Sequence, residues 1–249
     1  MQRVQLGNTG ITVSRLALGT DVLGRPKGWG PSPAEYALVL RQAFELGVNF
    51  WDTSDDYGTH PHVRFALQGL DRANIVISTK TWARDAAGAQ RSLESSLAEL
   101  GTDYVDIFLM HGVRPDDLDA ALRTIRALRH AKADGLVRAV GLSTHYVAVA
   151  NQVAEDTDVE VVYVTFNPIG FDIDDGSLED MSQAAARCFA AGKGVCTMKA
   201  LALGRLVYSL VPALQFSLNF PYSHSVLIGI KSTEELEADV AIAEGRTSR

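Results

Sequence analysis

Cysteine is scarce in this sequence, which contains only Cys188 and Cys196 among its 249 residues. The two residues form no CxxC motif and have no companion histidines, so they lack the spacing of a typical metal or redox site. Cysteines of intracellular proteins are usually reduced. We therefore expect two buried, reduced thiols, one in a helix and one in a strand.

Long apolar runs and an excess of positive charge are absent too. No apolar run reaches the roughly 18 residues that a membrane span requires, and the first residues, MQRVQLGNTG, lack the apolar region of a secretion signal. Acidic residues outnumber basic ones by 30 to 23, which gives a formal net charge of −7. This balance argues against nucleic acid or an anionic membrane surface as the main partner. We expect a soluble, cytoplasmic protein.

The composition is that of an ordinary globular chain. Hydrophobic residues make up 47% and charged residues 21% of the sequence, which is enough apolar material for a sizeable core. The length suits a single (β/α)8 barrel, which typically needs about 250 residues. No linker or low-complexity tract interrupts the chain, so we expect one domain over residues 1–249.

Short apolar, β-rich runs alternate with longer segments in which apolar residues have helical spacing. The runs recur roughly every 30 residues, the repeat of a strand followed by a crossover helix. They are apolar on both faces, as expected where helices cover a parallel sheet. The predicted strands cover 15–20, 48–53, 74–80, 104–111, 137–144, 159–167, 194–201 and 225–230, and the clearest predicted helices cover 32–47, 86–101, 117–135 and 178–194.

Eight such units favour a closed (β/α)8 TIM barrel. A doubly wound open sheet is the alternative, but the residues after the first predicted strand contain no GxGxxG fingerprint. Two further short runs, RVQL and ITV, precede that strand and are separated by GNTG at 7–10, which is typical of a hairpin turn. We expect this N-terminal β-hairpin to close the bottom of the barrel.

Four residues suggest the chemistry: Asp52, Tyr57, Lys80 and His111 each lie at or just past the C-terminal end of a predicted strand. In a parallel barrel those ends converge on one rim. A hydride that reaches a carbonyl carbon leaves negative charge on oxygen, which a hydrogen-bond donor must stabilise or protonate. A free phenol has a pKa of about 10, and a neighbouring ammonium lowers it. The four side chains together are suited to carbonyl reduction.

The sequence resembles the aldo-keto reductases along nearly its whole length. The segments that carry the resemblance are VQLGNTGITVSRLALGT, WDTSDDYG, STK, YVDIFLMHG, GLSTH and VLIGIKSTEELEADV, which occur in the order of that family. The resemblance implies Tyr57 as general acid, Lys80 and Asp52 as the pair that tunes it, and His111 as the residue that orients the substrate. It also implies a nicotinamide cofactor and a small carbonyl or alcohol substrate.

The same resemblance implies a set of cofactor contacts. Gly19, Thr20 and Asp21 would lie against the nicotinamide ribose, and Ser143 would bond the carboxamide. Three positions depart from the family pattern: Thr144 replaces a common Asn, Tyr163 a common Gln, and Met198 a common Tyr. The full predicted set of cofactor-binding residues is Gly19, Thr20, Asp21, Ser143, Thr144, Tyr163, Met198, Lys199, Leu201, Lys231, Ser232 and Glu235.

The choice between NADPH and NADH depends on the segment around Lys231. Lys231 and Ser232 resemble the family's 2′-phosphate contacts and favour NADPH. The arginine that often reinforces this contact is missing, and Glu235 falls close to its place, where a carboxylate would repel a 2′-phosphate and suit the ribose diol of NADH. Lys231 and Glu235 are equally consistent with an ordinary solvated helix start. We favour NADP(H).

The connecting loops look short for this family after the fourth and seventh predicted strands. Beyond the last predicted strand, 225–230, we expect one further helix that ends shortly before GRTSR. We expect an open substrate pocket, broad substrate tolerance, high KM values and fast cofactor release. Candidate pocket walls are Trp29, Trp82 and His145.

Two other functions are compatible with parts of the sequence. One is a nicotinamide-binding regulatory subunit that senses redox state, as in the channel-associated members of the family. The other is a metal-dependent barrel hydrolase, in which His60 and His62 with His111 and a carboxylate would hold the metal. Because Pro61 interrupts the His60–His62 pair, we expect these residues in a turn that leads into a helix, with no metal bound.

Overall fold

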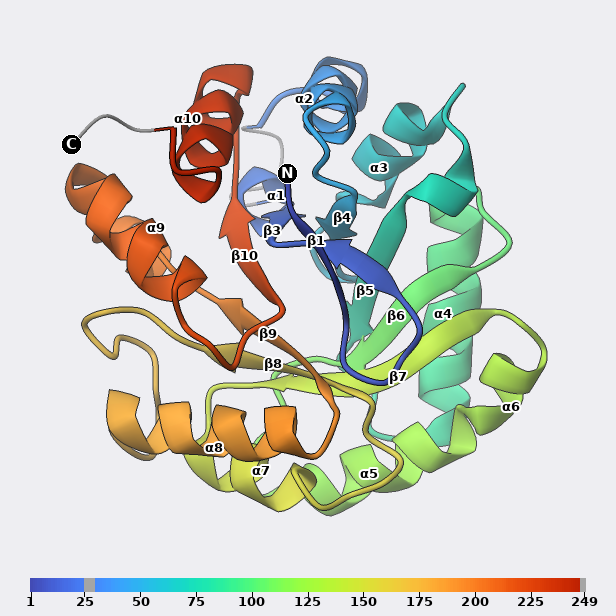
Figure 1. Ribbon diagram of the computed structural model, residues 1–249. Helices are drawn as coiled ribbons and strands as arrows, with labels where there is room; N and C mark the ends of the chain where they lie inside the picture. The colour runs from blue at the N-terminus through green and yellow to red at the C-terminus, as the bar shows by residue number, and fades with distance from the viewer. Residues whose placement is uncertain (25–29, 247–249) are drawn as a thin grey trace.

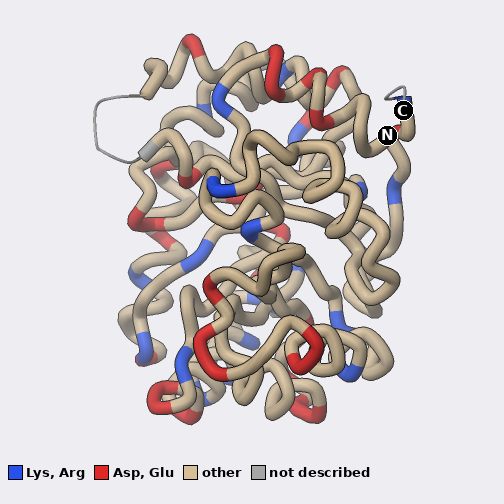
Figure 2. The backbone as a smooth tube through the Cα atoms, turned by 90° about the vertical axis from the view of Figure 1, so that its left-hand side faces the viewer, with Lys and Arg blue, Asp and Glu red and all other residues tan. Residues whose placement is uncertain are grey.

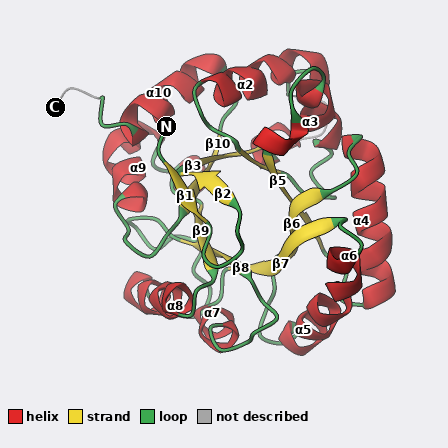
Figure 3. Cartoon of the chain, turned by 45° about the vertical axis from the view of Figure 1, so that its right-hand side comes forward, coloured by secondary structure: helices red, strands yellow, loops and turns green. Residues whose placement is uncertain are grey.

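Eight parallel strands close into a barrel in the computed structural model, which describes residues 1–24 and 30–246. Figure 3 looks into one end of this barrel, with the helices forming an outer ring. The ring of strands closes because β10 pairs with both β3 and β9. This confirms the predicted (β/α)8 TIM barrel. The barrel strands are β3 (Leu16–Gly19), β4 (Phe50–Asp52), β5 (Val76–Thr81), β6 (Val105–Met110), β7 (Val137–Thr144), β8 (Val161–Thr165), β9 (Gly194–Met198) and β10 (Ser225–Gly229).

Helices follow the strands around the outside of the barrel (Figure 1). Each of the four predicted helical segments is helical. Side-chain and glycine caps mark their ends: Ser32 and Ser177 form capping boxes at the starts of α2 and α8, and Gly101 adopts a left-handed conformation after α4. The helices are α1 (Asp21–Gly24), α2 (Pro33–Glu45), α3 (His60–Leu67), α4 (Ala86–Leu100), α5 (Leu118–Ala127), α6 (Arg129–Ala133), α7 (Val147–Val153), α8 (Leu178–Ala190), α9 (Leu210–Leu218) and α10 (Thr233–Ala243), with 3₁₀ turns η1 (Arg72–Asn74), η2 (Ala202–Gly204) and η3 (Val207–Ser209).

The segment 117–135, predicted as one helix, is divided into α5 and α6 at Leu128. The ψ angle of Leu128 is −3°, well away from the α-helical value near −42°. Its N–H is shared between the carbonyl groups of Thr124 and Ile125, each 3.1 Å away. The last turn of α5 is therefore tightened towards 3₁₀ geometry, which changes the direction of the chain before α6.

The predicted N-terminal hairpin is present as β1 (Arg3–Gln5) paired antiparallel with β2 (Thr12–Ser14). Leu6 and Ile11, which flank these strands, and Val13 within β2 are fully buried and belong to the apolar cluster that fills the barrel interior. The turn between them docks on the segment before β9. A Cβ at Gly7, whose φ is +52°, would lie 2.4 Å from the Lys193 carbonyl carbon, so the turn requires glycine here. The hairpin closes the amino-terminal end of the barrel.

Two apolar cores hold the fold together. One lies between the strands and the surrounding helices and the other lies inside the barrel. Cys188 in α8 and Cys196 in β9 are both buried and unpaired, as the sequence predicted, and burial raises the pKa of the Cys188 thiol to about 11. Figure 2 shows Lys and Arg distributed along the backbone among the acidic residues. Within residues 1–24 and 30–246, none of the helices has both the length and the apolar content that a bilayer crossing requires.

Candidate active site

The carboxyl ends of β4, β5 and β6 are neighbours in the barrel, because β4 pairs with β5 and β5 with β6. Asp52 is the last residue of β4, Lys80 lies near the end of β5, and His111 immediately follows β6. Tyr57 lies in the loop after β4. The structure therefore brings together the four residues that the sequence singled out.

Lys80 is held by two oxygen atoms below the rim. Its Nζ lies 2.5 Å from Asp52 Oδ2 and donates to the carbonyl oxygen of Thr53 at 2.8 Å. Both side chains of the pair are 2% exposed. Burial raises the pKa of Asp52, and the attraction of Lys80 works in the opposite direction. A pair so deeply buried fixes the ammonium in place.

Tyr57 lies above this ion pair. The Lys80 ammonium is 5.1 Å from the centre of the Tyr57 ring, and the phenolic oxygen is 3.4 Å from His111 Nε2. The two rings meet edge to face, with centroids 5.6 Å apart. Tyr57 is 9% exposed and so reaches the surface of the rim.

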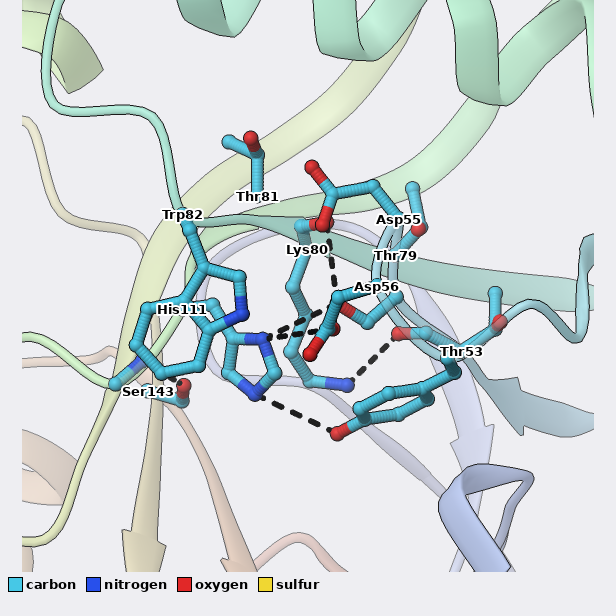
Figure 4. Close-up of polar contacts among 12 residues, drawn as sticks. Thr53, Asp55, Asp56, Thr79, Lys80, Thr81, Trp82, His111 and Ser143 are labelled. Atoms are coloured by element: carbon cyan, nitrogen blue, oxygen red, sulfur yellow. Dashed lines mark hydrogen bonds and ion pairs between the residues drawn. The ribbon is translucent and has the colours of Figure 1, made fainter. Parts of the chain in front are cut away.

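His111 is fixed from several sides (Figure 4). Its main-chain N–H donates to the carbonyl oxygen of Thr81 at 2.8 Å, and the Arg84 guanidinium donates to the carbonyl oxygen of His111 at 2.6 Å. Trp82 lies against the imidazole, with ring centroids 4.4 Å apart. Burial lowers the pKa of His111, although the hydrogen bond that its ring donates to the Asp56 carboxylate acts in the opposite direction. His111 is therefore neutral in the resting protein near neutral pH.

Sequence reasoning missed Asp56 and Ser54. Asp56 Oδ1 lies 3.5 Å from His111 Nδ1, and Ser54 Oγ lies 3.1 Å from the same nitrogen. The available signal was the WDTSDDYG segment itself, in which Asp55 and Asp56 are adjacent and look alike. The side chain of Asp55 instead accepts a hydrogen bond from Ser92 at 2.7 Å. Only the loop conformation shows which carboxylate faces the imidazole.

The predicted ribose contacts lie at the same rim. Gly19 is the last residue of β3 and pairs with Asp52, and Asp21 begins α1. The Thr20 hydroxyl lies 3.0 Å from the Asp52 carbonyl oxygen and 2.7 Å from Thr59 Oγ1. Thr20 is fully buried. Its side chain therefore supports the loop after β4.

The hydroxyl groups of Ser143 and Thr144, the residues predicted near the carboxamide, differ in whether a proton is left to donate. Ser143 Oγ accepts the Gly112 N–H at 2.9 Å, so its own hydroxyl proton remains to be donated. Thr144 donates to the Val113 carbonyl oxygen at 2.8 Å and accepts from the Tyr146 N–H at 3.0 Å, so its hydroxyl is engaged within the protein.

Two more of the predicted cofactor residues belong to the barrel interior. Tyr163 is fully buried among the interior apolar side chains, 5.9 Å from Lys80 Nζ to the ring centre. Burial raises its pKa. Met198, at the end of β9, belongs to the same interior cluster and is 8% exposed. Tyr163 thus lies below the rim, whereas Met198 reaches it.

Lys199 is part of an ionic cluster at the carboxyl ends of β7 and β9. It forms an ion pair with Asp172, and His145 Nδ1 lies 3.0 Å from the same carboxylate oxygen. Lys199 and Asp172 both have positive φ, 62° and 69°. Leu201 precedes η2 and is partly exposed.

Lys231, Ser232 and Glu235 form the start of α10. The Ser232 hydroxyl accepts from the Glu235 N–H at 3.3 Å, and the Glu235 carboxylate accepts from the Lys231 N–H at 2.7 Å. These contacts are those of a capped helix start. They place a carboxylate beside Lys231 at the end of β10.

His60 and His62 do not converge on one point. They form part of the first turn of α3, where proline is well tolerated, so the turn predicted around Pro61 is already helical. His60 contacts Glu99 and Thr79 at 2.7 and 3.0 Å, whereas His62 contacts the Pro31 carbonyl oxygen at 3.1 Å. Within the part of the chain that the structure describes, no group of three or more His, Cys, Asp or Glu residues is arranged to hold a metal ion.

Of the three residues predicted to line the substrate pocket, the structure describes two. Trp82 is 51% exposed at the rim, and His145 is 25% exposed. Trp29 lies outside the described residues.

Comparison with known proteins identifies the family. Residues 15–211 match the model of the Aldo/keto reductase family. L-galactose dehydrogenase from Arabidopsis thaliana is 28% identical to this chain, in a match that covers 95% of this chain and 86% of the plant protein. NADH-specific methylglyoxal reductase from Escherichia coli is also 28% identical, over 57% of this chain and 51% of that protein.

Solved structures agree with these matches. An aldo-keto reductase from Pseudomonas aeruginosa superimposes with a TM-score of 0.81 and 29% identity, covering 98% of this chain and 94% of that one. The holo form of an aldo-keto reductase from Bacillus halodurans gives the same TM-score at 24% identity, over 98% and 91% of the two chains, which supports the fold alone.

Proposed function

Because this chain belongs to the aldo-keto reductases, oxidoreductases that use nicotinamide cofactors, we propose that it reduces aldehydes, ketones or sugars to alcohols with NAD(P)H. The observation that carries the proposal is the grouping at one rim of a phenol, a buried ammonium and an imidazole. The Tyr57 hydroxyl lies 3.4 Å from His111 Nε2, with Lys80 5.1 Å from the phenol ring.

In this proposal Tyr57 is the general acid. A carbonyl oxygen bound at the rim accepts a hydrogen bond from Tyr57 and takes its proton as negative charge develops. The Lys80 ammonium favours the phenolate that remains, because an opposite charge stabilises the charged form. Asp52 holds Lys80 in position from below. His111 orients the carbonyl oxygen from the other side.

The residues at the rim fit a nicotinamide cofactor, which supplies the hydride when it is bound. Ser143 has a hydroxyl proton to donate to a carboxamide oxygen. Lys231 adds a positive charge at the N-terminus of α10, where helix N–H groups favour phosphate. The proposed cofactor contacts are those predicted from the sequence, except that we assign no direct hydrogen bond to Thr144, whose hydroxyl is engaged within the protein, or to Tyr163, which is buried below the rim.

We propose NADP(H) in preference to NAD(H), on the strength of Lys231 and Ser232. Glu235 opposes this preference, because its carboxylate lies against the Lys231 N–H. A 2′-phosphate at this position would need the carboxylate to move aside. The preference is therefore small and sensitive to this one residue.

We further propose an open pocket with broad substrate tolerance and fast cofactor release. The segment between β6 and α5 is limited to residues 111–117, and that between β9 and α9 to residues 199–209. Segments of this length leave little chain to cover a bound cofactor.

The test is the loss of NADPH absorbance, and separately that of NADH, with a panel of small aldehydes, diketones and sugars. Tyr57→Phe should lower turnover by about 10² to 10⁴-fold, because a general acid contributes that much. Tyr222→Phe, at a tyrosine that is 40% exposed, is the matched control and should keep wild-type turnover. Cofactor binding without turnover would favour a regulatory subunit, and metal-dependent hydrolysis would favour a barrel hydrolase. Equal activity in Tyr57→Phe and the wild type would contradict the proposal.

A further inference from the structure

Both groups beside His111 Nδ1 are hydrogen-bond acceptors towards it. Ser54 Oγ lies 3.1 Å from this nitrogen and Asp56 Oδ1 lies 3.5 Å from it. The Ser54 hydroxyl has a single proton, which it donates to Asp56 Oδ1 at 2.7 Å, with the Lys80 carbonyl oxygen at 3.3 Å as a second acceptor. Ser54 therefore presents a lone pair to His111, and Nδ1 has to supply the proton.

The charge of Asp56 is consistent with this arrangement. Partial burial acts to raise its pKa, but hydrogen bonds from His111 and Ser54 outweigh burial and hold the pKa well below the usual range. Asp56 is therefore a carboxylate at neutral pH, and a carboxylate only accepts hydrogen bonds.

We propose that Asp56, acting with Ser54, is a positioning residue that keeps the proton of neutral His111 on Nδ1. A neutral imidazole carries one proton, so Nε2 is then an acceptor. The Tyr57 hydroxyl, 3.4 Å from Nε2, donates to it in the resting protein. His111 gains a donor at Nε2 only when it becomes an imidazolium.

The consequence for catalysis rests on the proposed function. A carbonyl oxygen is an acceptor, so His111 hydrogen-bonds it through Nε2 only in the imidazolium form. Asp56 is placed to stabilise that form, because its negative charge faces the opposite ring nitrogen (Figure 4). Reduction should therefore decline as the pH rises through the pKa of His111.

Other charged groups around the ring act on the same equilibrium. Lys80 lowers the pKa of His111 and Asp52 raises it, while burial has the largest effect and lowers it. The titratable and charged groups facing His111 are Asp52 from β4, Asp56 and Tyr57 from the loop after β4, Lys80 from β5, Arg84 from the loop after β5, and His145 after β7.

The first experiment uses NMR of the imidazole nitrogens in ¹⁵N-histidine-labelled wild-type protein without substrate. The expected result is a neutral His111 with a protonated Nδ1 and an unprotonated Nε2. A neutral ring with its proton on Nε2 overturns the inference. This measurement needs no variant and no activity.

The second experiment compares Asp56→Asn with Asp55→Asn. Asp55→Asn is the control, because it removes a charge of the same sign from the neighbouring residue. The Asp55 carboxylate accepts a hydrogen bond from Ser92 and not from His111. In Asp56→Asn the pKa of His111 should fall by about one unit, because an opposite charge has been lost. In Asp55→Asn it should stay close to the wild-type value. An unchanged His111 pKa in Asp56→Asn overturns the inference.

Activity separates this role from a merely structural one. The pH at which reduction is half lost should shift down by the same unit in Asp56→Asn, while kcat at low pH converges on the wild-type value. Failure to converge overturns the positioning role. If the wild type reduces no carbonyl compound although its Nδ1 is protonated and the pKa shift is found, the proposed function fails and the role of Asp56 in holding the His111 proton stands.

Discussion

The Asp52 carboxylate and the Lys80 ammonium form an ion pair that solvent barely reaches, with Nζ 2.5 Å from Oδ2 and both side chains 2% exposed. The pair connects β4 to β5 directly below the Tyr57 ring. A charge removed from this position leaves its partner buried and uncompensated, which is far more costly than the loss of a surface contact.

We predict that Lys80→Met lowers the free energy of unfolding by about 3 to 5 kcal/mol, because Asp52 would remain buried without its cation. The double variant Asp52→Asn/Lys80→Met should lose less than the sum of the two single variants. Urea unfolding measures all three. Lys132→Met is the control: Lys132 is 41% exposed in its pair with Glu160, and its loss should cost about 1 kcal/mol or less. Equal costs for Lys80 and Lys132 would contradict the prediction.

Trp82 should affect both substrate binding and His111. It packs on the imidazole and is 51% exposed, so Trp82→Ala removes an apolar wall and admits water. We expect KM to rise about tenfold, as for the loss of one aromatic contact. The pKa of His111 should rise towards its ordinary value, because burial is what lowers it. Steady-state kinetics and NMR titration measure the two effects.

Trp82→Phe is the matched variant for this test, since it keeps an aromatic ring against His111. In Trp82→Phe, both KM and the pKa of His111 should lie closer to the wild-type values than to those of Trp82→Ala. A Trp82→Ala protein with wild-type KM would show that this ring is not part of the pocket.

Glu235 should control the choice of cofactor. Its carboxylate lies 2.7 Å from the Lys231 N–H, where it would repel a 2′-phosphate. Glu235→Ala should raise the ratio of kcat/KM for NADPH to that for NADH by about tenfold, equivalent to about 1.4 kcal/mol. Glu234→Ala removes a charge from the same helical turn and should leave the ratio within about twofold of wild type. Parallel changes in the two variants would mean that only the overall charge of the helix start matters.

Asp239 should make the protein less stable as the pH rises towards neutrality. The side chain is 3% exposed in α10, and burial, together with Glu235, raises its pKa to about 7. In the folded state it therefore keeps a proton that the unfolded chain releases near pH 4. The folded state binds more protons at Asp239 between these two values, so the contribution of Asp239 to the free energy of unfolding is most favourable below about pH 4 and is lost as the pH rises to about 7.

Asp239→Asn removes this titration. The free energy of unfolding of Asp239→Asn should exceed that of the wild type by an amount that grows between about pH 4 and about pH 7, to at most about 4 kcal/mol. Urea unfolding at about pH 5 and about pH 8 measures the change. Glu234→Gln, at an exposed position, should follow the wild-type pH dependence. A constant difference between Asp239→Asn and the wild type would refute the assignment.

The fold could be predicted because strands that are buried on both faces produce continuous apolar runs in the sequence. Strands such as β6 and β8 are buried at every position, so they appear in the sequence as apolar runs bounded by helical segments. The gathering of Asp52, Lys80 and His111 then follows from their places at the ends of successive strands.

The remaining features depend on local geometry that the sequence does not specify. Asp55 and Asp56 are chemically identical neighbours, and only the path of the loop turns one towards Ser92 and the other towards His111. The engagement of Thr144 by main-chain groups depends on the conformations of two loops. The division between α5 and α6 at Leu128 occurs without a glycine or proline, the residues by which a helix break is usually predicted.

The N-terminal hairpin limits how ligands exchange. Leu6, Ile11 and Val13 seal the amino-terminal mouth, and apolar side chains occupy the lumen above them. These side chains block passage through the barrel from end to end, so under the proposed function both reactants must enter and leave at the carboxyl-terminal end. Whichever of them sits deeper has to arrive first and depart last. Initial-rate and product-inhibition patterns should accordingly be those of a compulsory order.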